Sequence, residues 1–450
     1  MRSPDQRAAP TAEDHLKWLV ELQRFGMHPG LARVHALLAA IGTPQRTFDV
    51  VLVAGTNGKG STASVLSACL RAAGRRTGLF ISPHLRRFGE RATVDGVETA
   101  DAEMAAVVAL VRPHAERLGA SFFEVVTAVC ALVFKRAGVK VAVMEVGMGG
   151  RLDATNAFEP VLSIITGVAL DHMAVLGEDV VTIAGEKAGI LRHGVPALTA
   201  ARGRALRTIE DEATRLGAPL TVLGSGLSVA VTRSSWNGLE LSITGLVDEA
   251  DTVLRVTTPL VGRHQADNVA LAVAGAVMLR VPREAVRAGV AAARWPGRLE
   301  RLPYQGRHVV LDGAHNTQAA GALAAALAEL EPDCHVLVLG TSADKDHDGL
   351  LPPLLGVARH IVVTRSRLSP RATEPERLAA LVAAARAGSG GRVQVDEPVT
   401  IAADPATALA TAVRLTPVAG TIVVAGSLFL VGEVRSLVLQ ETGEEAERWQ

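Results

Sequence analysis

Short apolar runs rich in valine, leucine and isoleucine alternate along this chain with longer alanine-rich runs in which apolar residues recur at helical spacing. The short runs predict buried strands and the longer runs predict helices. We expect strands at Val50–Val53, Arg76–Ile81, Val139–Val146, Val161–Val168, His308–Asp312, His335–Gly340, His360–Thr364 and Thr421–Gly426. We expect helices at Glu13–Arg24, Leu31–Ile41, Ser61–Ala73, Ala102–Leu118, Phe122–Ala137, Gln265–Met278, Arg283–Ala293, Thr317–Leu330, Glu374–Ala385 and Pro405–Arg414. This alternation predicts an α/β fold in which helices cover both faces of parallel sheets.

A different pattern occurs between about residues 221 and 258. Apolar and polar residues alternate within 227–233 and 239–244, which predicts antiparallel hairpins that form a small sheet on the first domain. Pro296 and Gly297 then interrupt the helical pattern, and a new series of strands and helices begins with Val309. We therefore expect one domain over residues 1–295 and a second over residues 296–450.

Composition limits the classes of partner and compartment. Lys+Arg 46 balance Asp+Glu 46, which argues against nucleic acid and anionic membranes as partners. No apolar run reaches the roughly 20 residues that a membrane helix needs, and the first twelve residues lack the apolar core of a signal peptide. Cys69, Cys130 and Cys334 lie in apolar contexts and are expected to be buried thiols in a reducing compartment. We therefore expect a soluble cytoplasmic protein.

The stretch Val-Ala-Gly-Thr-Asn-Gly-Lys-Gly-Ser, which ends at Ser61, lies between a predicted strand and a predicted helix. Its three glycines allow the backbone to turn around a phosphate with the amide groups pointing inward. Lys59 brings a charge for the β- and γ-phosphates, and Ser61 offers a hydroxyl to Mg²⁺. The loop departs from the common G-x-x-x-x-G-K-[ST] pattern because Gly60 separates the lysine from the hydroxyl. The alternative is a glycine-rich turn without a ligand.

Three further polar groups follow predicted strands or lie in apolar helical sequence. Glu145 ends a buried strand just before a glycine turn, where it could ligate the Mg²⁺ of a nucleotide or serve only as a capping or ion-pairing group. His172 also follows a strand and is by default a structural hydrogen-bonding residue. Lys187 lies in a mostly apolar helical stretch, where the simplest interpretation is a lysine that extends its amine to the surface.

The phosphate loop, with Gly-Ser after its lysine, resembles the ATP loop of folylpolyglutamate synthases and dihydrofolate synthases in the Mur ligase superfamily. Further segments similar to this family occur in the family's order, namely Pro29–Val34, Thr43–Gln45, Ser82–Leu85, Arg87–Arg91, Ser121–Glu124, Glu145–Asn156, Asp171-His172, Glu186–Ile190, Gly262–Gln265 with Asn268, Trp295–Glu300, Leu311–Asn316 and Asp344-Lys345. Departures are small. Thr317 stands where a proline usually follows, and Ala92 and Ser121 replace residues whose change could tune substrate preference.

The resemblance implies a P-loop-type parallel-sheet ATPase domain with a small antiparallel sheet, followed by a Rossmann-like α/β domain that closes over the nucleotide. It implies a monomeric ligase that uses ATP and two Mg²⁺ ions. ATP phosphorylates a folate-type carboxylate, and the amine of L-glutamate attacks the acyl phosphate. Dihydropteroate is a second possible acceptor of glutamate. One alternative is a peptidoglycan-type Mur ligase, but that class is expected to have a further N-terminal domain, and only about 50 residues precede the loop. The other alternative is a nucleotide switch or kinase without ligase activity.

Residue roles also follow from the resemblance. The implied metal ligands are Ser61, Ser82, Glu145, His172 and a carbamylated Lys187. The implied nucleotide contacts are Thr56, Asn57, Gly58, Lys59, Gly60, Ser61, Asn268, Arg298 and Asp312, and the implied catalytic groups are Lys59, Lys187 and His315, the last beside the glutamate site. The implied pteridine contacts are Met27, His28, Pro29, Ser121, Phe122, Phe123, Glu124, Leu152, Asp153 and Ala154. For Phe122 and Phe123, a purely structural place in the core at a helix start is equally compatible with the sequence.

Overall fold

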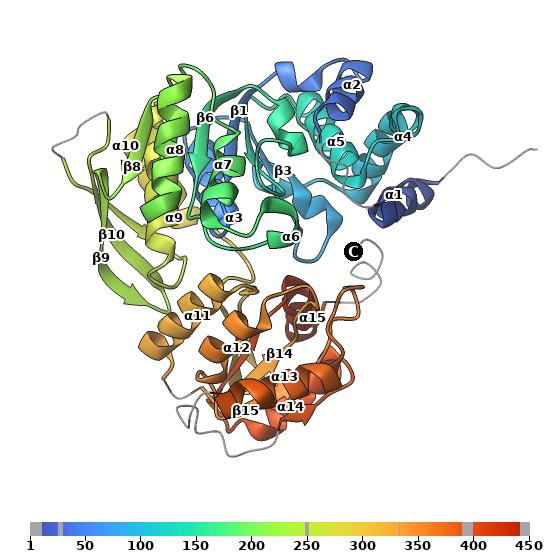
Figure 1. The fold of residues 1–450 in the computed structure, drawn as a ribbon, viewed down its shortest axis with the longest axis vertical. Coiled ribbons are helices and arrows are strands. Elements are labelled where there is room, and N and C mark those ends of the chain that lie inside the picture. Colours follow the sequence, from blue (N-terminus) through green and yellow to red (C-terminus); the bar gives the residue numbers. More distant parts are fainter. Residues whose placement is uncertain (1–10, 26–29, 248–251, 333, 389–398, 442–450) are drawn as a thin grey trace, which may run out of the picture.

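The first lobe of the molecule is built on one long sheet (Figure 1). The structure is a computed structural model, and it describes residues 11–25, 30–247, 252–332, 334–388 and 399–441. Within this part of the chain the sheet has 11 strands in the order β11-β10-β9-β8-β7-β6-β1-β5-β2-β3-β4. The strands are β1 (Asp49–Ala54), β2 (Thr77–Phe80), β3 (Ala92–Val94), β4 (Val97–Glu98), β5 (Val141–Glu145), β6 (Pro160–Ile165), β7 (Ala197–Thr199), β8 (Leu220–Leu223), β9 (Gly226–Ser235), β10 (Gly238–Thr244) and β11 (Leu254–Thr258).

Parallel pairing joins the central strands from β2 to β8, whereas β9, β10 and β11 pair antiparallel. The antiparallel strands predicted for residues 221–258 are thus present, and they continue the edge of the main sheet through β8. The helices of this lobe are α1 (Ala12–Glu21), α2 (Ala32–Ala40), α3 (Lys59–Ala72), α4 (Asp101–Leu118), α5 (Phe122–Arg136), α6 (Met173–Leu176), α7 (Val180–Ala188), α8 (Gly203–Leu216), α9 (Gln265–Met278) and α10 (Arg283–Ala292), with 3₁₀ turns at Leu22–Phe25, Pro44–Arg46, Phe88–Arg91 and Ala154–Ala157.

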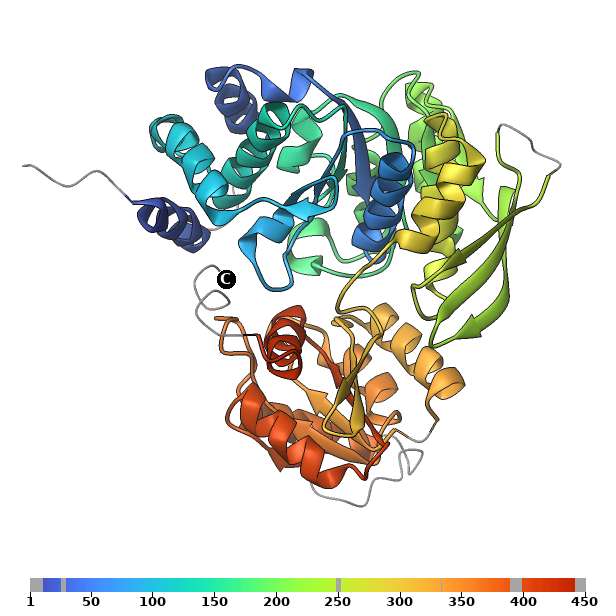
Figure 2. The ribbon, with the colours of Figure 1, turned by 180° about the vertical axis from the view of Figure 1, so that it is seen from behind.

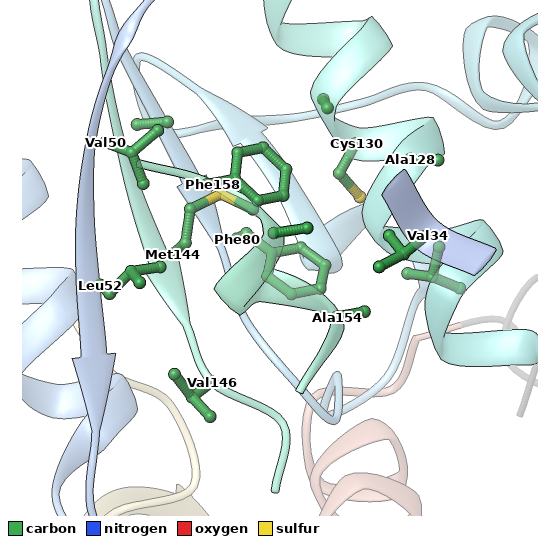
Figure 3. Packing of buried hydrophobic residues seen from close by; sticks show 14 of the residues in the cluster. Val34, Val50, Leu52, Phe80, Ala128, Cys130, Met144, Val146, Ala154 and Phe158 are labelled. Atoms are coloured by element: carbon green, nitrogen blue, oxygen red, sulfur yellow. The ribbon is translucent and has the colours of Figure 1, made fainter. Parts of the chain in front are cut away.

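Both faces of the central strands are covered, as their almost continuous apolar sequence requires. Leu52 of β1, Phe80 of β2 and Met144 of β5 belong to one core cluster, which α4 and α5 complete (Figure 3). Val51 and Val53 of β1 belong to a second cluster on the opposite face, beneath α3 and α9. Successive side chains of a strand point to opposite faces, so this division follows directly from the strand geometry.

The second lobe holds a six-stranded sheet in the order β12-β13-β17-β14-β15-β16 among the described residues (Figure 2). Its elements are β12 (Glu300–Tyr304), β13 (Arg307–Leu311), α11 (Thr317–Leu330), β14 (Val336–Leu339), α12 (His347–Leu355), β15 (His360–Val363), α13 (Pro375–Gly388), β16 (Thr400–Ile401), α14 (Pro405–Leu415), β17 (Thr421–Ala425) and α15 (Leu428–Val438). All pairs are parallel except β12 with β13. The predicted α/β fold is confirmed. No helix in the part of the chain that the structure describes is long and apolar enough to cross a membrane.

Candidate active site

A cleft of about 1030 Å³ lies between the carboxyl ends of the first lobe's strands and the second lobe. It is lined by every residue predicted to contact nucleotide or metal or to act in catalysis, namely Thr56, Asn57, Gly58, Lys59, Gly60, Ser61, Ser82, Glu145, His172, Lys187, Asn268, Arg298, Asp312 and His315. Their positions follow the general rule that ligands bind at the carboxyl ends of parallel strands. Segments hundreds of residues apart therefore meet at one site.

The phosphate loop connects β1 to α3, whose first residue is Lys59. Gly58 has φ 88°, and a Cβ at this residue would lie 2.1 Å from Asn268 Oδ1. A Cβ on Gly60 would lie 2.2 Å from the Trp295 ring, which belongs to the connection between the lobes. The unusual glycine after the lysine is therefore explained by close packing, because no larger residue fits against Trp295 without a shift.

Two lysine amines converge on this loop. Lys59 Nζ donates to Gly55 O at 3.1 Å and to Thr56 O at 3.0 Å, and Lys187 Nζ donates to the same Gly55 O at 3.0 Å. Lys187 is only 3% exposed. Burial, together with the charge of Lys59, lowers the pKa of Lys187 to about 7. A substantial fraction of this amine is therefore neutral and nucleophilic near neutral pH.

Oxygen and nitrogen donors suited to a divalent metal surround the same region. Glu145 is buried at the end of β5, and burial raises the pKa of its carboxyl group, an effect that Lys59 opposes. Its Oε2 accepts a hydrogen bond from the Ser82 amide at 3.3 Å. Ser82 Oγ is buried and has no hydrogen-bond partner, which fits a hydroxyl that awaits a ligand. His172 takes a left-handed φ of 51° before α6 and is exposed at the cleft, where desolvation and the charges of nearby lysines lower its pKa, so its imidazole is available as a neutral ligand.

No group of three or more His, Cys, Asp or Glu side chains suited to a metal occurs in the described residues. A metal at this site would therefore depend on the predicted mixed set, in which hydroxyls and a carbamylated lysine add to Glu145 and His172. Ser61 and Ser82 would supply the hydroxyls, and the neutral amine of Lys187 is suited to carbamylation. The residues present thus fit the predicted metal site.

The second lobe contributes the groups that follow β13. Asp312 accepts hydrogen bonds from the Leu299 and Ala314 amides at 2.9 Å each, and burial raises its pKa while Arg298 opposes this shift. His315 Nδ1 lies 2.7 Å from Gly313 O, so Nδ1 carries the proton and Nε2 is free to accept one. Burial and the charge of a nearby lysine lower the pKa of His315 to about 4, which keeps the imidazole neutral.

None of the described pteridine candidates lines the cleft, but Asp153 bonds to Met148, which does line it. Ser121 caps α5, and Glu124 Oε2 accepts from the Ser121 amide and hydroxyl at 2.7 Å each and from Arg33 Nε at 3.2 Å. Asp153 is buried and accepts from the Met148 amide and from Thr155. These side chains hold local structure, and their contact with a substrate stays a prediction.

The remaining candidates in this group differ in exposure. Phe123 packs 5.9 Å from Phe80 between ring centroids, and Phe122 lies against Phe88. Leu152 is 48% exposed, whereas Ala154 is buried. Met27, His28 and Pro29 lie outside the described residues. Both phenylalanines are only partly buried against the core, so a role in the core and a face toward a ligand are compatible.

We expect Gly147→Ala to disturb the Phe123 ring, because the added Cβ would lie 2.4 Å from Phe123 Cζ. If this ring stacks on the substrate, the KM for a pteridine substrate should rise by about 10-fold or more, which corresponds to a loss of about 1.4 kcal/mol of binding free energy. The Kd for ATP should change little. Gly356→Ala is the matched control because nothing lies within 4 Å of its Cβ position. An unchanged KM in a folded Gly147→Ala protein would remove Phe123 from the substrate site.

Sequence reasoning missed a set of contacts that join the two lobes. Asp171 Oδ1 accepts from Lys345 Nζ at 2.8 Å, and Asp171 Oδ2 accepts from Asn316 Nδ2 at 3.0 Å. Asn316 also exchanges side-chain hydrogen bonds with Asn57 of the phosphate loop at 3.2 and 3.0 Å. Each residue lies within a segment similar to the family, but the sequence does not pair them, because the bonded partners are 145 to 259 positions apart.

Comparisons with known proteins place these features in a family. Residues 53–276 match the Mur ligase middle domain, and residues 297–428 match the glutamate ligase domain of Mur ligases. The chain is 39% identical to the probable bifunctional folylpolyglutamate synthase/dihydropteroate synthase of Haloferax volcanii over 94% of this chain and 50% of that protein. It thus spans about half the length of the first relatives that it matches. It is 37% identical to the dihydrofolate synthase/folylpolyglutamate synthase of Mycobacterium tuberculosis, over 97% of this chain and 95% of the relative.

Solved structures agree with these sequence relatives. The folylpolyglutamate synthase of Mycobacterium tuberculosis complexed with ADP has a TM-score of 0.85 and 34% identity, covering 95% of this chain and 99% of that one. The bifunctional folylpolyglutamate synthase/dihydrofolate synthase of Yersinia pestis complexed with AMPPNP and Mn has a TM-score of 0.82 and 30% identity, covering 96% of this chain and 100% of that one. The similarity therefore extends over both lobes.

Proposed function

This chain belongs to the dihydrofolate synthase/folylpolyglutamate synthase family of Mur ligases, and we propose that it joins the carboxylate of a folate-type substrate to the amine of L-glutamate at the expense of ATP. The observation that carries this proposal is a cleft that is lined both by Lys59, Lys187 and Glu145 of the first lobe and by His315 of the second. A nucleotide switch would need the phosphate loop but not the second lobe's histidine.

The proposed chemistry has two steps. The γ-phosphoryl group of ATP passes to the substrate carboxylate, and Lys59 and the loop amides stabilise the charge that spreads over its oxygens. The glutamate amine then attacks the acyl carbon, so that a C–N bond forms and the bond from carbon to the phosphate oxygen breaks. The neutral Nε2 of His315 can accept a hydrogen bond from that amine and orient it.

We further propose that Mg²⁺ would be held by Ser61, Ser82, Glu145, His172 and carbamylated Lys187, where it would neutralise charge on the transferring phosphoryl group. The buried, unpaired Ser82 Oγ supports this assignment. Nucleotide contacts are assigned to residues 56–61 with Asn268, Arg298 and Asp312. The bound ADP and AMPPNP of the related structures support ATP as the nucleotide.

We infer that residues 1–295 form an ATP-binding domain and residues 296–450 a glutamate ligase domain. Their separate sheets and the two family matches support this division. We also propose that dihydropteroate and reduced folates both serve as acceptors of glutamate, because relatives of nearly equal length carry both names. A monomer is proposed for the functional unit, since the cleft is assembled from one chain.

One assay tests the proposed function. ADP release is measured with ATP and Mg²⁺, with and without L-glutamate, using dihydropteroate or tetrahydrofolate as the acceptor. We expect release to require both the acceptor and glutamate, and we expect mass spectrometry to find the product heavier by one glutamyl unit. ADP release that is independent of glutamate would instead support a kinase or a nucleotide switch.

For the metal site, we expect Glu145→Gln to raise the Mg²⁺ concentration needed for half-maximal activity by at least about 10-fold, because it removes a charged ligand and keeps the shape. His172→Ala should add to this increase. Glu374→Gln, which alters an exposed ion pair with Arg365, is the control and should leave the titration unchanged. Wild-type Mg²⁺ titrations in both site variants would exclude these residues as ligands.

A further inference from the structure

The tip of the β9–β10 hairpin leaves the first lobe and contacts the second lobe at the end of α11 (Figures 1 and 2). Trp236, at this tip, donates from Nε1 to Leu330 O at 3.0 Å. Its ring packs against the apolar core of the second lobe, and the Arg301 guanidinium lies 5.0 Å from the ring centroid. Hydrogen bonding, apolar packing and a cation–π contact therefore act at one tryptophan.

The hydrogen bond to Leu330 has a clear physical role, because the last carbonyl groups of a helix have no partner within the helix. Leu330 is the last residue of α11, and Trp236 supplies the missing donor from the other lobe. On the same turn, Arg263 of the first lobe pairs with Glu329 at 2.9 Å. The first lobe thus contacts the C-terminal end of α11 at both Glu329 and Leu330.

The opposite end of α11 lies in the cleft. Asn316 caps the helix by accepting from the Ala319 amide at 3.0 Å, and it also bonds to Asn57 of the phosphate loop and to Asp171. His315 immediately precedes this cap. One helix, of about 21 Å by its 14 residues, is therefore held by the first lobe at both ends.

We propose that Trp236 is a positioning residue for the ligase reaction, which acts by fixing the distal end of α11 so that the other end presents His315 and Asn316 to the phosphate loop. The inference rests on the proposed function. A tilt of about 5° at one end moves the other end of a helix this long by about 2 Å. Displacements of about 1 Å can lower the rate by about 100-fold. The hairpin contact can therefore change kcat although Trp236 does not touch a substrate.

The kinetic test compares Trp236→Ala with Trp236→Phe. We expect Trp236→Ala to lower kcat for glutamate addition by about 10- to 100-fold. The Kd for ATP should change by less than about 2-fold, because the proposed nucleotide contacts, namely residues 56–61, Asn268, Arg298 and Asp312, all lie outside α11. Trp236→Phe keeps an aromatic ring under Arg301 and should recover a large part of kcat. Trp18→Ala is the matched control, since Arg112 lies 5.0 Å from the Trp18 ring entirely within the first lobe.

A physical measurement separates this inference from the proposed function. Spin labels on the surface of each lobe report the distance distribution between the lobes, with and without ADP. We expect a broader distribution in Trp236→Ala than in wild type or Trp18→Ala, whatever the acceptor substrate is. If Trp236→Ala matches Trp18→Ala in both kcat and interlobe distances, the positioning role is overturned. If only the distances broaden and no ligase activity exists in wild type, the proposed function fails and the mechanical role stands.

Discussion

Lys59→Ala is expected to lower kcat by about 10²- to 10³-fold or more, because it removes the cation that faces the transferring phosphoryl group in a buried site. In the structure the amine donates to Gly55 O and Thr56 O, both within 3.1 Å, which keeps it over the loop that is predicted to bind the phosphates. The fold should survive, since these bonds are made only to the loop. Steady-state kinetics and thermal unfolding measure the two effects.

Lys135→Ala is the control for this substitution. Lys135 Nζ also donates to a glycine carbonyl, that of Gly42 at 3.2 Å, but it does so on the exposed side of the first lobe. Its replacement should leave kcat unchanged. Lys59→Arg tests whether charge alone suffices, and we expect only partial activity because the planar guanidinium needs more room than the loop provides. Near-wild-type catalysis in Lys59→Ala would disprove the assignment of this loop to phosphates.

Helices with sharp sequence boundaries are predicted well. The ranges for α9 and α11 agree with the structure at both ends, and α11 begins after a capping Asn316 and ends before Pro332. By contrast, α12 was not predicted because Pro352 and Pro353 indicate a break. Its buried leucines pack against neighbouring helices, and this tertiary packing outweighs the local signal.

Two further omissions have physical reasons of their own. Few polar turn residues separate α15 from the buried strand before it, and Gly432 within the helix indicates a helix break. The glycine is there because a Cβ would lie 2.1 Å from Leu85 O of the first lobe. The edge strand β12 contains Pro303, which sequence patterns exclude from the interior of a sheet but which an edge tolerates.

The candidate site shows the same division. Glu145 is the last residue of a buried strand, and Lys59 begins the helix after the loop that follows another. This local context is sufficient to place both at one edge of a parallel sheet. The pairing of Asp171 with Lys345, and the contact of Trp236 with Leu330, depend on how two lobes meet. No local pattern encodes such an arrangement, so these contacts could be found only in the structure.

Activity is expected to depend on CO₂ through Lys187. Its amine is almost fully buried beside Lys59, and burial and that neighbouring charge lower its pKa to about 7. The neutral amine attacks CO₂, so that an N–C bond forms and one proton leaves to solvent. The carbamate keeps one N–H, which can still donate to Gly55 O as the amine does now at 3.0 Å. It also replaces a cation next to Lys59 by an anion, which removes a like-charge contact.

The sign of the pH dependence follows from this chemistry. As pH falls through about 7, Lys187 binds a proton and cannot form a carbamate, so activity should fall in buffer depleted of CO₂. Added bicarbonate should restore activity and shift the midpoint to lower pH, because CO₂ competes with protons for the same nitrogen. Lys187→Gln should lose most activity and show no response to bicarbonate.

A direct measurement uses ¹³C-labelled bicarbonate and the NMR signal of a carbamate carbon in the holoenzyme. We expect a signal that is present in the wild type, absent in Lys187→Gln, and lost in parallel with activity when the pH is lowered. Activity that is indifferent to CO₂, together with no difference between the two spectra, would leave Lys187 as an unmodified amine that donates to the phosphate loop. The proposed metal site would then lack the carbamate oxygen, and Glu145 and His172 would be left with the two hydroxyls, since the described residues include no group of three His, Cys, Asp or Glu side chains that could hold a metal.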